Sequence, residues 1–256
     1  MNRYSAVIAT FCVVLSACDT PSNQHYLIDE TSKVHSPVIG DYIQYNVLDP
    51  FNGTSKSATT EWLAETSLSV NDNKPQEFDE AYQIKRSNFT SNSAHYNGLL
   101  RGLDDEGNEM MYGLRFGGDT TYWAKQPGAN EYGIKILPAE AYTLTEIYSV
   151  DANLESCKEF TCSNVGSYSR SITYVDRKTQ QTALAEFEVY DFVINETISI
   201  ADGATSINIA SNTLVSIYPP LGEVHIWYTD NELEYIASLA NTNIKIEFQT
   251  TVDAAQ

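Results

Sequence analysis

The amino-acid sequence predicts a mainly β protein. We expect one large antiparallel, meander-like sheet, curved as a half-barrel or sandwich, with one or two short helices. The first observation is an alternation of apolar and polar residues with period two, which is typical of a sheet with one buried and one wetted face. The second is the placement of turn residues between these runs at short, hairpin-like intervals. The third is the abundance of Tyr, Thr, Ile and Val, which suit pleated, half-buried surfaces.

The strands follow from the alternation. In DYIQYNVL, Ile43, Tyr45 and Val47 occupy one face, and polar residues separate them. Similar runs cover residues 62–70, 112–116, 224–228 and 244–248. In EFEVYDFVI the apolar positions change from one face to the other, and a β-bulge near Tyr190 and Asp191 would reconcile the two faces.

Two segments are candidates for the short helices. PAEAYTLTEIYS begins at Pro138, and proline is favoured at the first position of a helix, although its Thr, Tyr and Ile residues suit a strand as well. NELEYIASLA, which begins at Asn231, is the better candidate. Its apolar residues fall on one side of a helix: Leu233, Ile236, Ala237 and Ala240.

The N-terminal segment has the pattern of a bacterial export signal. Arg3 precedes an apolar run over residues 6–17, which is shorter than the roughly 20 residues that a spanning helix needs. The run ends in Leu15-Ser16-Ala17-Cys18, which resembles the lipobox of bacterial lipoproteins. The resemblance implies that residues 1–17 are a signal peptide and that Cys18 becomes the first residue, with a diacylglycerol on its sulfur and an acyl chain on its amino group.

The rest of the chain then divides into two parts. Residues 18–37 would hold the lipidated cysteine and a polar tether, and residues 38–256 a single β-rich periplasmic domain. The expected location is the bacterial cell envelope, lipid-anchored and facing the periplasm. Asp19 resembles the signal that retains lipoproteins in the inner membrane of enteric bacteria, but the choice between inner and outer membrane stays open.

Two stretches of the body carry a second resemblance. IGDYIQYNV, after the tether, and YPPLGEVHIWY, near the C-terminus, resemble segments of uncharacterised β-rich periplasmic lipoproteins. The resemblance implies a β-rich domain and carries over no catalytic residue.

Charge and cysteine content narrow the function classes. The chain has 15 basic and 34 acidic residues, a net charge of −19, which argues against nucleic acid and against electrostatic docking on anionic lipid. Of the four cysteines, Cys12 lies in the export segment and Cys18 in the lipobox. The remaining two, Cys157 and Cys162 in CKEFTC, should form a disulfide in the oxidising periplasm, with a catalytic redox pair as the alternative.

Candidate binding residues are few. Trp123, Trp227 and His225 lie in aromatic-rich runs that could line a concave sheet and hold lipid tails, sugar rings or a peptide, with core packing as the alternative. A weak candidate for a cation site is the stretch DDEGNE, and a polar hairpin tip explains the same residues. Its oxygen donors are Asp104, Asp105, Glu106, Asn108 and Glu109. We predict no metal site, cofactor or catalytic residue, because no hydrolase, P-loop or zinc pattern occurs.

Three functional hypotheses follow. The first is a membrane-tethered, non-enzymatic binding or interaction module, whose partners are the membrane, through its anchor, and an envelope protein or a lipid or glycan ligand. The alternative is a lipid or small-ligand carrier with an apolar cavity. The second alternative is a hydrolase whose acidic residues or His225 converge only in space.

Overall fold

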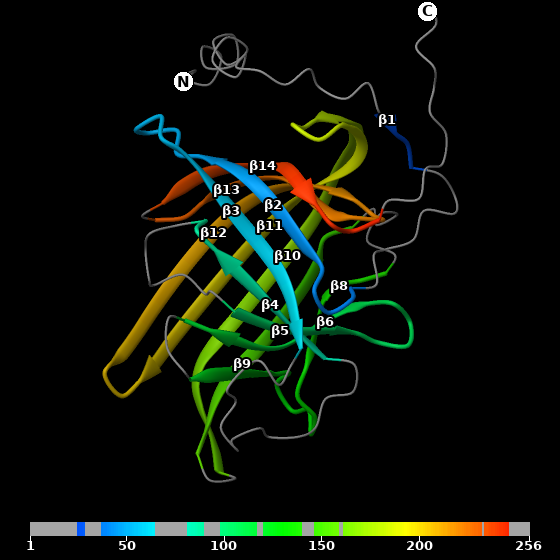
Figure 1. Ribbon diagram of the computed structural model, residues 1–256. Helices are drawn as coiled ribbons and strands as arrows, with labels where there is room; N and C mark the ends of the chain where they lie inside the picture. The colour runs from blue at the N-terminus through cyan, green and yellow to red at the C-terminus, as the bar shows by residue number, and fades with distance from the viewer. Residues whose placement is uncertain are drawn as a thin grey trace, which may run out of the picture.

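Twelve antiparallel strands close into a barrel in the computed structural model of this chain (Figure 1). The structure describes residues 25–28, 37–64, 81–89, 98–116, 120–139, 146–158, 161–231 and 233–245. Its strands, including two outside the ring of twelve, are β1 (His25–Tyr26), β2 (Tyr42–Leu48), β3 (Ser55–Ala64), β4 (Tyr82–Ser87), β5 (Gly98–Leu103), β6 (Glu109–Arg115), β7 (Thr121–Lys125), β8 (Ile134–Leu137), β9 (Tyr148–Lys158), β10 (Thr161–Gln181), β11 (Glu186–Asp202), β12 (Thr205–Tyr218), β13 (Gly222–Thr229) and β14 (Glu234–Thr242).

The barrel is a meander that closes on itself. From β2 to β14, neighbours in the ring are neighbours in the chain, apart from the short β8, and β14 pairs with β2 to close it. At the closing seam Val47 lies opposite Ala237. The predicted large antiparallel meander is therefore confirmed, and its curvature completes a closed barrel.

Strands β7 and β8 share one position in the barrel. Both pair with β6, which sets Gly113 opposite Trp123 of β7 and Met111 opposite Ile134 of β8. The chain between them leaves the sheet and returns beside it, where Gly133 bridges Lys125. The two strands are therefore collinear halves of one interrupted strand.

The predicted helix from Asn231 is wrong, because β14 occupies that segment. Tyr235, Ala237 and Leu239 alternate with more exposed residues and are buried in the core. Pairing with β13 on one side and β2 on the other satisfies the backbone of this segment as a strand. The described residues include no helix, and so none that could cross a membrane. In the other candidate helix, residues 140–145 lie outside the described part.

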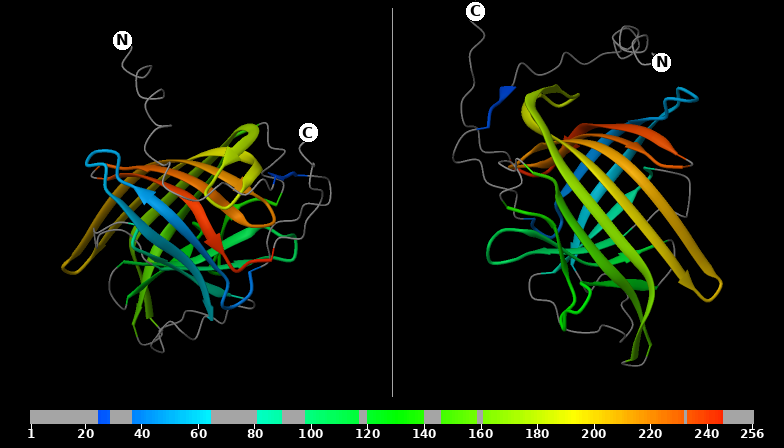
Figure 2. Two further views of the ribbon diagram at one scale, coloured as in Figure 1. Left: turned by 45° about the horizontal axis from the view of Figure 1, so that its top comes forward. Right: turned by 180° about the vertical axis from the view of Figure 1, so that it is seen from behind.

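The end of the β10–β11 hairpin bends over the strands β13 and β14 (Figure 1 and Figure 2). There the Ala183 amide donates a hydrogen bond to the Leu239 carbonyl. The bulge expected near Tyr190 and Asp191 lies instead in the partner strand β10, where the register shifts between Tyr174 and Asp176.

Strand β1 lies at the edge of β11, where it pairs in parallel with Glu186 and Phe187 beyond the end of β12. Tyr26 stacks on Phe187 of β11 at 4.9 Å between ring centroids, and Phe187 also contacts Tyr218. The buried residues of β11 change from Phe187 and Val189 to Phe192 and Ile194 opposite the register shift in β10. Residues 25–28 belong to the segment predicted as a tether; Cys18 and the signal peptide lie outside the described residues, and the proposed domain bounds stay predictions.

Candidate functional site

The interior of the barrel contains a cavity of about 90 Å³ beside the β12–β13 turn. Apolar and aromatic side chains from β2, β3, β4, β8, β11 and β12 form most of its wall. They include Trp62, Tyr82, Leu103, Leu137, Ile217 and Leu221. Three arginines and two glutamates complete the wall, so the cavity is charged as well as apolar.

The alternation of each strand turns the three arginines inward. Arg101 follows Leu99 by two residues on β5, and Arg170 lies between the buried Tyr168 and Ile172 on β10. Arg86 follows Ile84 by two residues on β4 in the same way. Alternate residues of a strand point to the same face, so an arginine two positions from a buried apolar residue points into the barrel with it.

Each arginine is paired with a glutamate from another strand. Arg86 Nη2 lies 2.7 Å from Glu223 Oε2, and Arg101 Nη1 lies 2.5 Å from Glu109 Oε1. Arg170 Nη1 lies 3.3 Å from Glu196 Oε2, which also accepts a 2.7 Å hydrogen bond from the Tyr168 hydroxyl. The first pair joins strands that are far apart in the sequence, β4 and β13, whereas the other two pairs each join consecutive strands of the meander.

The exposure of the three pairs shows how the cavity is oriented. The side chains of Arg170 and Glu196 are 9% and 8% exposed, whereas Arg86 and Glu223 are 16% and 28% exposed. The side chains of Arg101 and Glu109 are 9% and 18% exposed. The Arg86–Glu223 pair is therefore nearest the solvent and the Arg170–Glu196 pair is the deepest.

More guanidinium groups than carboxylates line the cavity directly. The wall includes all three guanidinium groups, but only Glu109 and Glu223 among their partners. The Nε–H of Arg101 is buried and has no hydrogen-bond acceptor in the part of the chain that the structure describes. Burial opposes the charged form of Arg101, yet its glutamate neighbours outweigh this effect and its pKa lies above the ordinary value. The site can therefore accept an anionic ligand.

Neighbouring tyrosines keep their protons. Burial, reinforced by Glu109, raises the pKa of the Tyr82 hydroxyl, and burial raises that of Tyr45 as well. The Tyr45 hydroxyl donates to the Glu223 carbonyl. These hydroxyls can therefore act as hydrogen-bond donors around the cavity at any physiological pH.

The weak candidate for a cation site forms a turn. Asp104 accepts hydrogen bonds from the amides of Glu106 and Asn108 and from the Asn108 side chain, while Glu109 turns inward to Arg101. Asp105 is exposed at the tip of the turn. Among the described residues, no three His, Cys, Asp or Glu side chains are close enough together to hold a metal ion.

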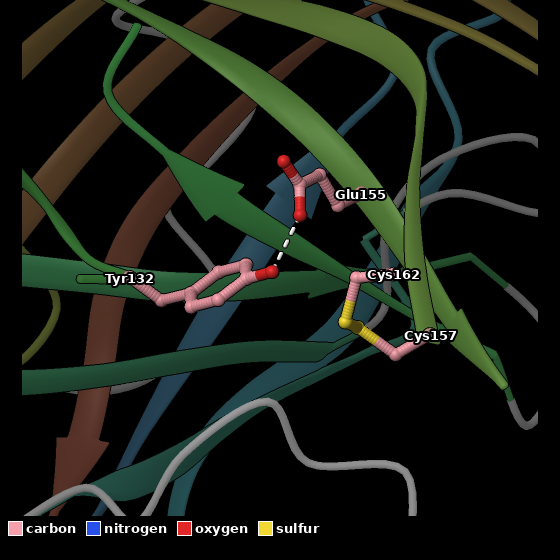
Figure 3. The surroundings of a disulfide bond; sticks show 4 residues. All are labelled: Tyr132, Glu155, Cys157 and Cys162. Atoms are coloured by element: carbon pink, nitrogen blue, oxygen red, sulfur yellow. Dashed lines mark hydrogen bonds between the residues drawn. A yellow bond between two sulfur atoms is a disulfide. The ribbon is translucent and has the colours of Figure 1, made fainter. Parts of the chain in front are cut away.

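Trp123 and the disulfide lie in a second, smaller apolar cluster. Cys157 and Cys162, opposite each other on β9 and β10, are joined as predicted (Figure 3). Trp123, only 1% exposed, packs with Leu100 and Cys157 there. Figure 3 also shows the Tyr132 hydroxyl donating a hydrogen bond to Glu155. Trp123 is thus a packing residue and not part of the barrel cavity.

His225 and Trp227 both lie on the outer face of β13. Trp227 is 45% exposed, and its indole nitrogen donates a 2.8 Å hydrogen bond to Glu234. His225 lies opposite Ser216, which is fully buried and donates to Asp191 at 2.7 Å. Burial, together with the nearby Lys178, lowers the pKa of His225. The Ser216 hydroxyl is therefore shielded from solvent and donates its hydrogen bond to Asp191 rather than to His225.

The three predicted ligand-binding residues are therefore not brought together, and sequence reasoning missed the charged residues of the cavity. The signal was present in the pattern. Arg101 lies midway between Leu99 and Leu103, which alternation turns to the same face of the strand. Arg170 lies midway between Tyr168 and Ile172 in the same way. A charged residue at a position where the alternation of the strand calls for an apolar one indicates a buried polar site.

Fold and cavity together define a closed antiparallel barrel with a charged internal site. No protein-family model matches this sequence, and no curated protein matches it. One similar solved structure is that of a chain from Parabacteroides distasonis inferred to be a lipoprotein, with 9% identity and a TM-score of 0.36, covering 84% of this chain and 100% of that one. Another is that of a chain from Bacteroides fragilis, inferred to be exported and described as having a YmcC-like fold, with 12% identity and a TM-score of 0.32, covering 82% and 99%.

Proposed function

We propose that this chain is a lipid-anchored, non-enzymatic binding protein of the bacterial envelope that holds a small organic anion in its barrel cavity. The observation that carries the binding role is Arg101. Its side chain is nine-tenths buried in the cavity wall, and its Nε–H has no acceptor among the described residues. A buried donor without an acceptor costs free energy that a ligand oxygen would recover.

The chemistry of the wall indicates a short-chain carboxylate. A carboxylate can accept hydrogen bonds from a guanidinium in a planar, two-point geometry. Leu103, Leu137 and Leu221 provide apolar wall for a short alkyl group. The cavity volume of about 90 Å³ is several times the roughly 10–15 Å³ that one water molecule needs by the same measure.

The same volume argues against the lipid carrier. Pockets for drug-sized ligands measure about 300–1,000 Å³, and this cavity is much smaller and charged. A lipid tail would have to displace the arginine–glutamate pairs from the interior, leaving buried charges without partners. We therefore favour a small polar ligand.

Binding is tested by thermal unfolding of the predicted mature chain without its lipid. Acetate, propionate and butyrate should raise the melting temperature in a saturable manner, because a ligand that binds only the folded state stabilises it by about 2.7 kcal/mol at 100 times Kd. Choline at equal ionic strength is the control ligand. Native mass spectrometry of the untreated protein would show any anion retained from the cell.

Arg101→Lys is the diagnostic variant. It keeps a positive charge beside Glu109 but removes the Nε–H donor, and should weaken binding at least tenfold. Arg115→Met changes an arginine that does not line the cavity, and should leave binding unchanged. Equal shifts in wild type and Arg101→Lys, or no shift with any carboxylate, would refute the binding role.

The anchor is tested separately. Cys18→Ala should abolish acylation and release the chain from membranes in cell fractionation, because stable anchoring depends on the acyl chains. Unchanged acylation and membrane association would disprove the anchor without affecting the binding role.

A further inference from the structure

A row of apolar residues crosses five neighbouring strands on the outer wall of the barrel. Strand register sets them opposite one another in the order Val193, Leu214, Trp227, Ile236 and Leu48, from β11 through β12, β13 and β14 to β2. Directly opposite residues point to the same side of a sheet, and here the alternate residues fill the core. All five retain exposure to solvent. We refer to them as the outer apolar stripe.

The wall around the stripe carries little charge. On β2, β12, β13 and β14, His225 and Glu234 are the only outward-facing residues with an acidic or basic side chain. The other outward positions include Gln44, Asn46, Asn208, Asn212, Thr229 and Ser238. This contrasts with the net charge of −19 for the chain. Because carboxylates lose hydration on approaching lipid, a wall with so few of them can approach a bilayer at low cost.

Trp227 has the chemistry of a membrane-interface residue. Its ring is an exposed apolar surface, and its indole N–H is satisfied by Glu234 at the edge of the stripe. Tryptophan is enriched at membrane–water interfaces because it combines an apolar ring with a polar N–H group. Phe51, in the turn that follows Leu48, is 79% exposed and extends the apolar surface. The wall lacks a basic patch, so a zwitterionic surface suits it better than an anionic one.

The predicted anchor keeps this wall close to the membrane. Seven residue steps separate Cys18 from His25, a span of at most about 25 Å. His25 and Tyr26 pair with Glu186 and Phe187 of β11. Six residues further along the same strand lies Val193, about 20 Å away. The tether therefore reaches far enough for the wall to lie flat on the bilayer and is too short to let the barrel move far from it.

We infer that the outer apolar stripe docks on the zwitterionic surface of the membrane that holds the anchor, so that the barrel lies on its side with β11 to β2 against the lipid. This inference uses the proposed anchor and is independent of the proposed ligand. It also places the cavity, which opens beside the β12–β13 turn, at one end of a barrel parallel to the membrane.

The test supplies the anchor chemically. The mature chain, residues 18–256, is produced without lipidation and coupled through its Cys18 thiol to a maleimide phospholipid in phosphatidylcholine vesicles. This tether is present even if cells do not acylate Cys18, so failure of the proposed anchor and failure of the docking are distinguishable. Vesicles with brominated acyl chains then quench the fluorescence of tryptophans that reach the lipid.

Brominated vesicles should lower the emission of the tethered wild type by roughly one third relative to plain vesicles, because interfacial apolar groups lie about 5–10 Å into the headgroup boundary. Trp227→Phe should remove this decrease. Lys85→Trp in the Trp227→Phe background sets a matched tryptophan at an exposed position of β4, on another part of the wall, and should not be quenched.

Equal emission in the two kinds of vesicle, or equal quenching of the Lys85→Trp control, would overturn the inference. So would a dimer of the untethered chain, in analytical ultracentrifugation, that the double variant Leu214→Ser/Ile236→Ser dissociates, because the stripe would then bind a second copy. Near-UV circular dichroism checks that each variant keeps its fold.

Discussion

At the scale of single residues, Arg101 and Glu109 show the free energy that burying an ion pair in the barrel costs. Their side chains are 9% and 18% exposed, and 2.5 Å separates their charged atoms. Removing two charges from water costs several kcal/mol per ion, which their attraction only partly recovers. A purely apolar pair would pack this position more cheaply. The retention of charge here supports a binding role for the cavity.

We predict that Glu109→Met lowers the free energy of unfolding by about 3 kcal/mol, because it leaves the Arg101 guanidinium buried without its carboxylate. The double variant Arg101→Met/Glu109→Met should be less than half as destabilised, since it removes both charges. Urea unfolding measures both values. A double variant less stable than Glu109→Met would show that the pair itself stabilises the barrel.

Gly166 is required where two strands approach each other closely. The register of β9 and β10 shifts between Asn164 and Gly166, and a Cβ at Gly166 would lie 2.1 Å from the Ser199 carbonyl oxygen. We predict that Gly166→Ala lowers the free energy of unfolding by about 1–3 kcal/mol, because the backbone of β11 must shift. Ser167→Ala, at the exposed neighbouring position, is the control and should have little effect in the same urea experiment.

At the scale of an element, the Glu188 carboxylate helps to hold the segment of β1 against the barrel. Glu188 Oε2 accepts hydrogen bonds from the Ile28 amide at 2.9 Å and from Arg177 Nη2 at 2.7 Å, while Arg177 also donates to the Ile28 carbonyl. The hydrogen bond from Arg177 contributes most to holding the pKa of Glu188 below its ordinary value, although partial burial works against it. The docking energy is therefore present above the ordinary glutamate pKa, near 4.3, and is lost as pH falls through the lower pKa of the folded state.

We predict that Glu188→Gln increases hydrogen exchange of the Ile28 amide at pH 7, after correction for intrinsic rates. The difference between variant and wild type should disappear at a pH below the folded-state pKa of Glu188. Peptide-resolved mass spectrometry measures this exchange, and Asp151→Asn on the exposed face of β9 is the control. A difference that persists unchanged in acid would mean that Glu188 does not hold β1 through its charge.

The whole molecule depends on a closure between distant segments. Val47 on β2 and Ala237 on β14 are neighbours across the seam, and almost the entire chain separates them. Closing so long a loop costs entropy before its contacts form, whereas the hairpins from β9 to β13 join strands that are adjacent in sequence. We therefore expect the hairpins to form before the seam.

This order predicts the kinetics of Val47→Ala. The variant should lose about 2 kcal/mol from lost burial and the cavity left behind, and most of the loss should appear as faster unfolding, by roughly 20- to 30-fold. Stopped-flow refolding and unfolding in urea measure both rates, with the outward-facing Asn46→Ala as the control. If the folding rate instead fell by roughly 20- to 30-fold while the unfolding rate stayed the same, the seam would belong to the folding nucleus.

The arrangement of the cavity could not be derived from the sequence. Arg86, Arg101 and Arg170 are each inward by the alternation of their own strands, but that pattern does not indicate which strands meet. Their glutamate partners lie on β13, β6 and β11. Arg101 and Arg170 meet glutamates of the next strand along the chain, but only the closed barrel pairs Arg86 with Glu223 and gathers the three pairs around one cavity. Sequence reasoning therefore selected the aromatic residues Trp123 and Trp227 instead.

The sequence by itself determined the fold class and the disulfide. Period-two alternation, as in Ile43, Tyr45 and Val47, results from the geometry of a single strand, and two cysteines remained for pairing once the export segment was removed. Tertiary structure decided the closure of the barrel, because an open and a closed sheet share the same alternation. It also decided the state of β14, because Ile236 and Ala237 satisfy a helical pattern until two neighbouring strands pair with their backbone.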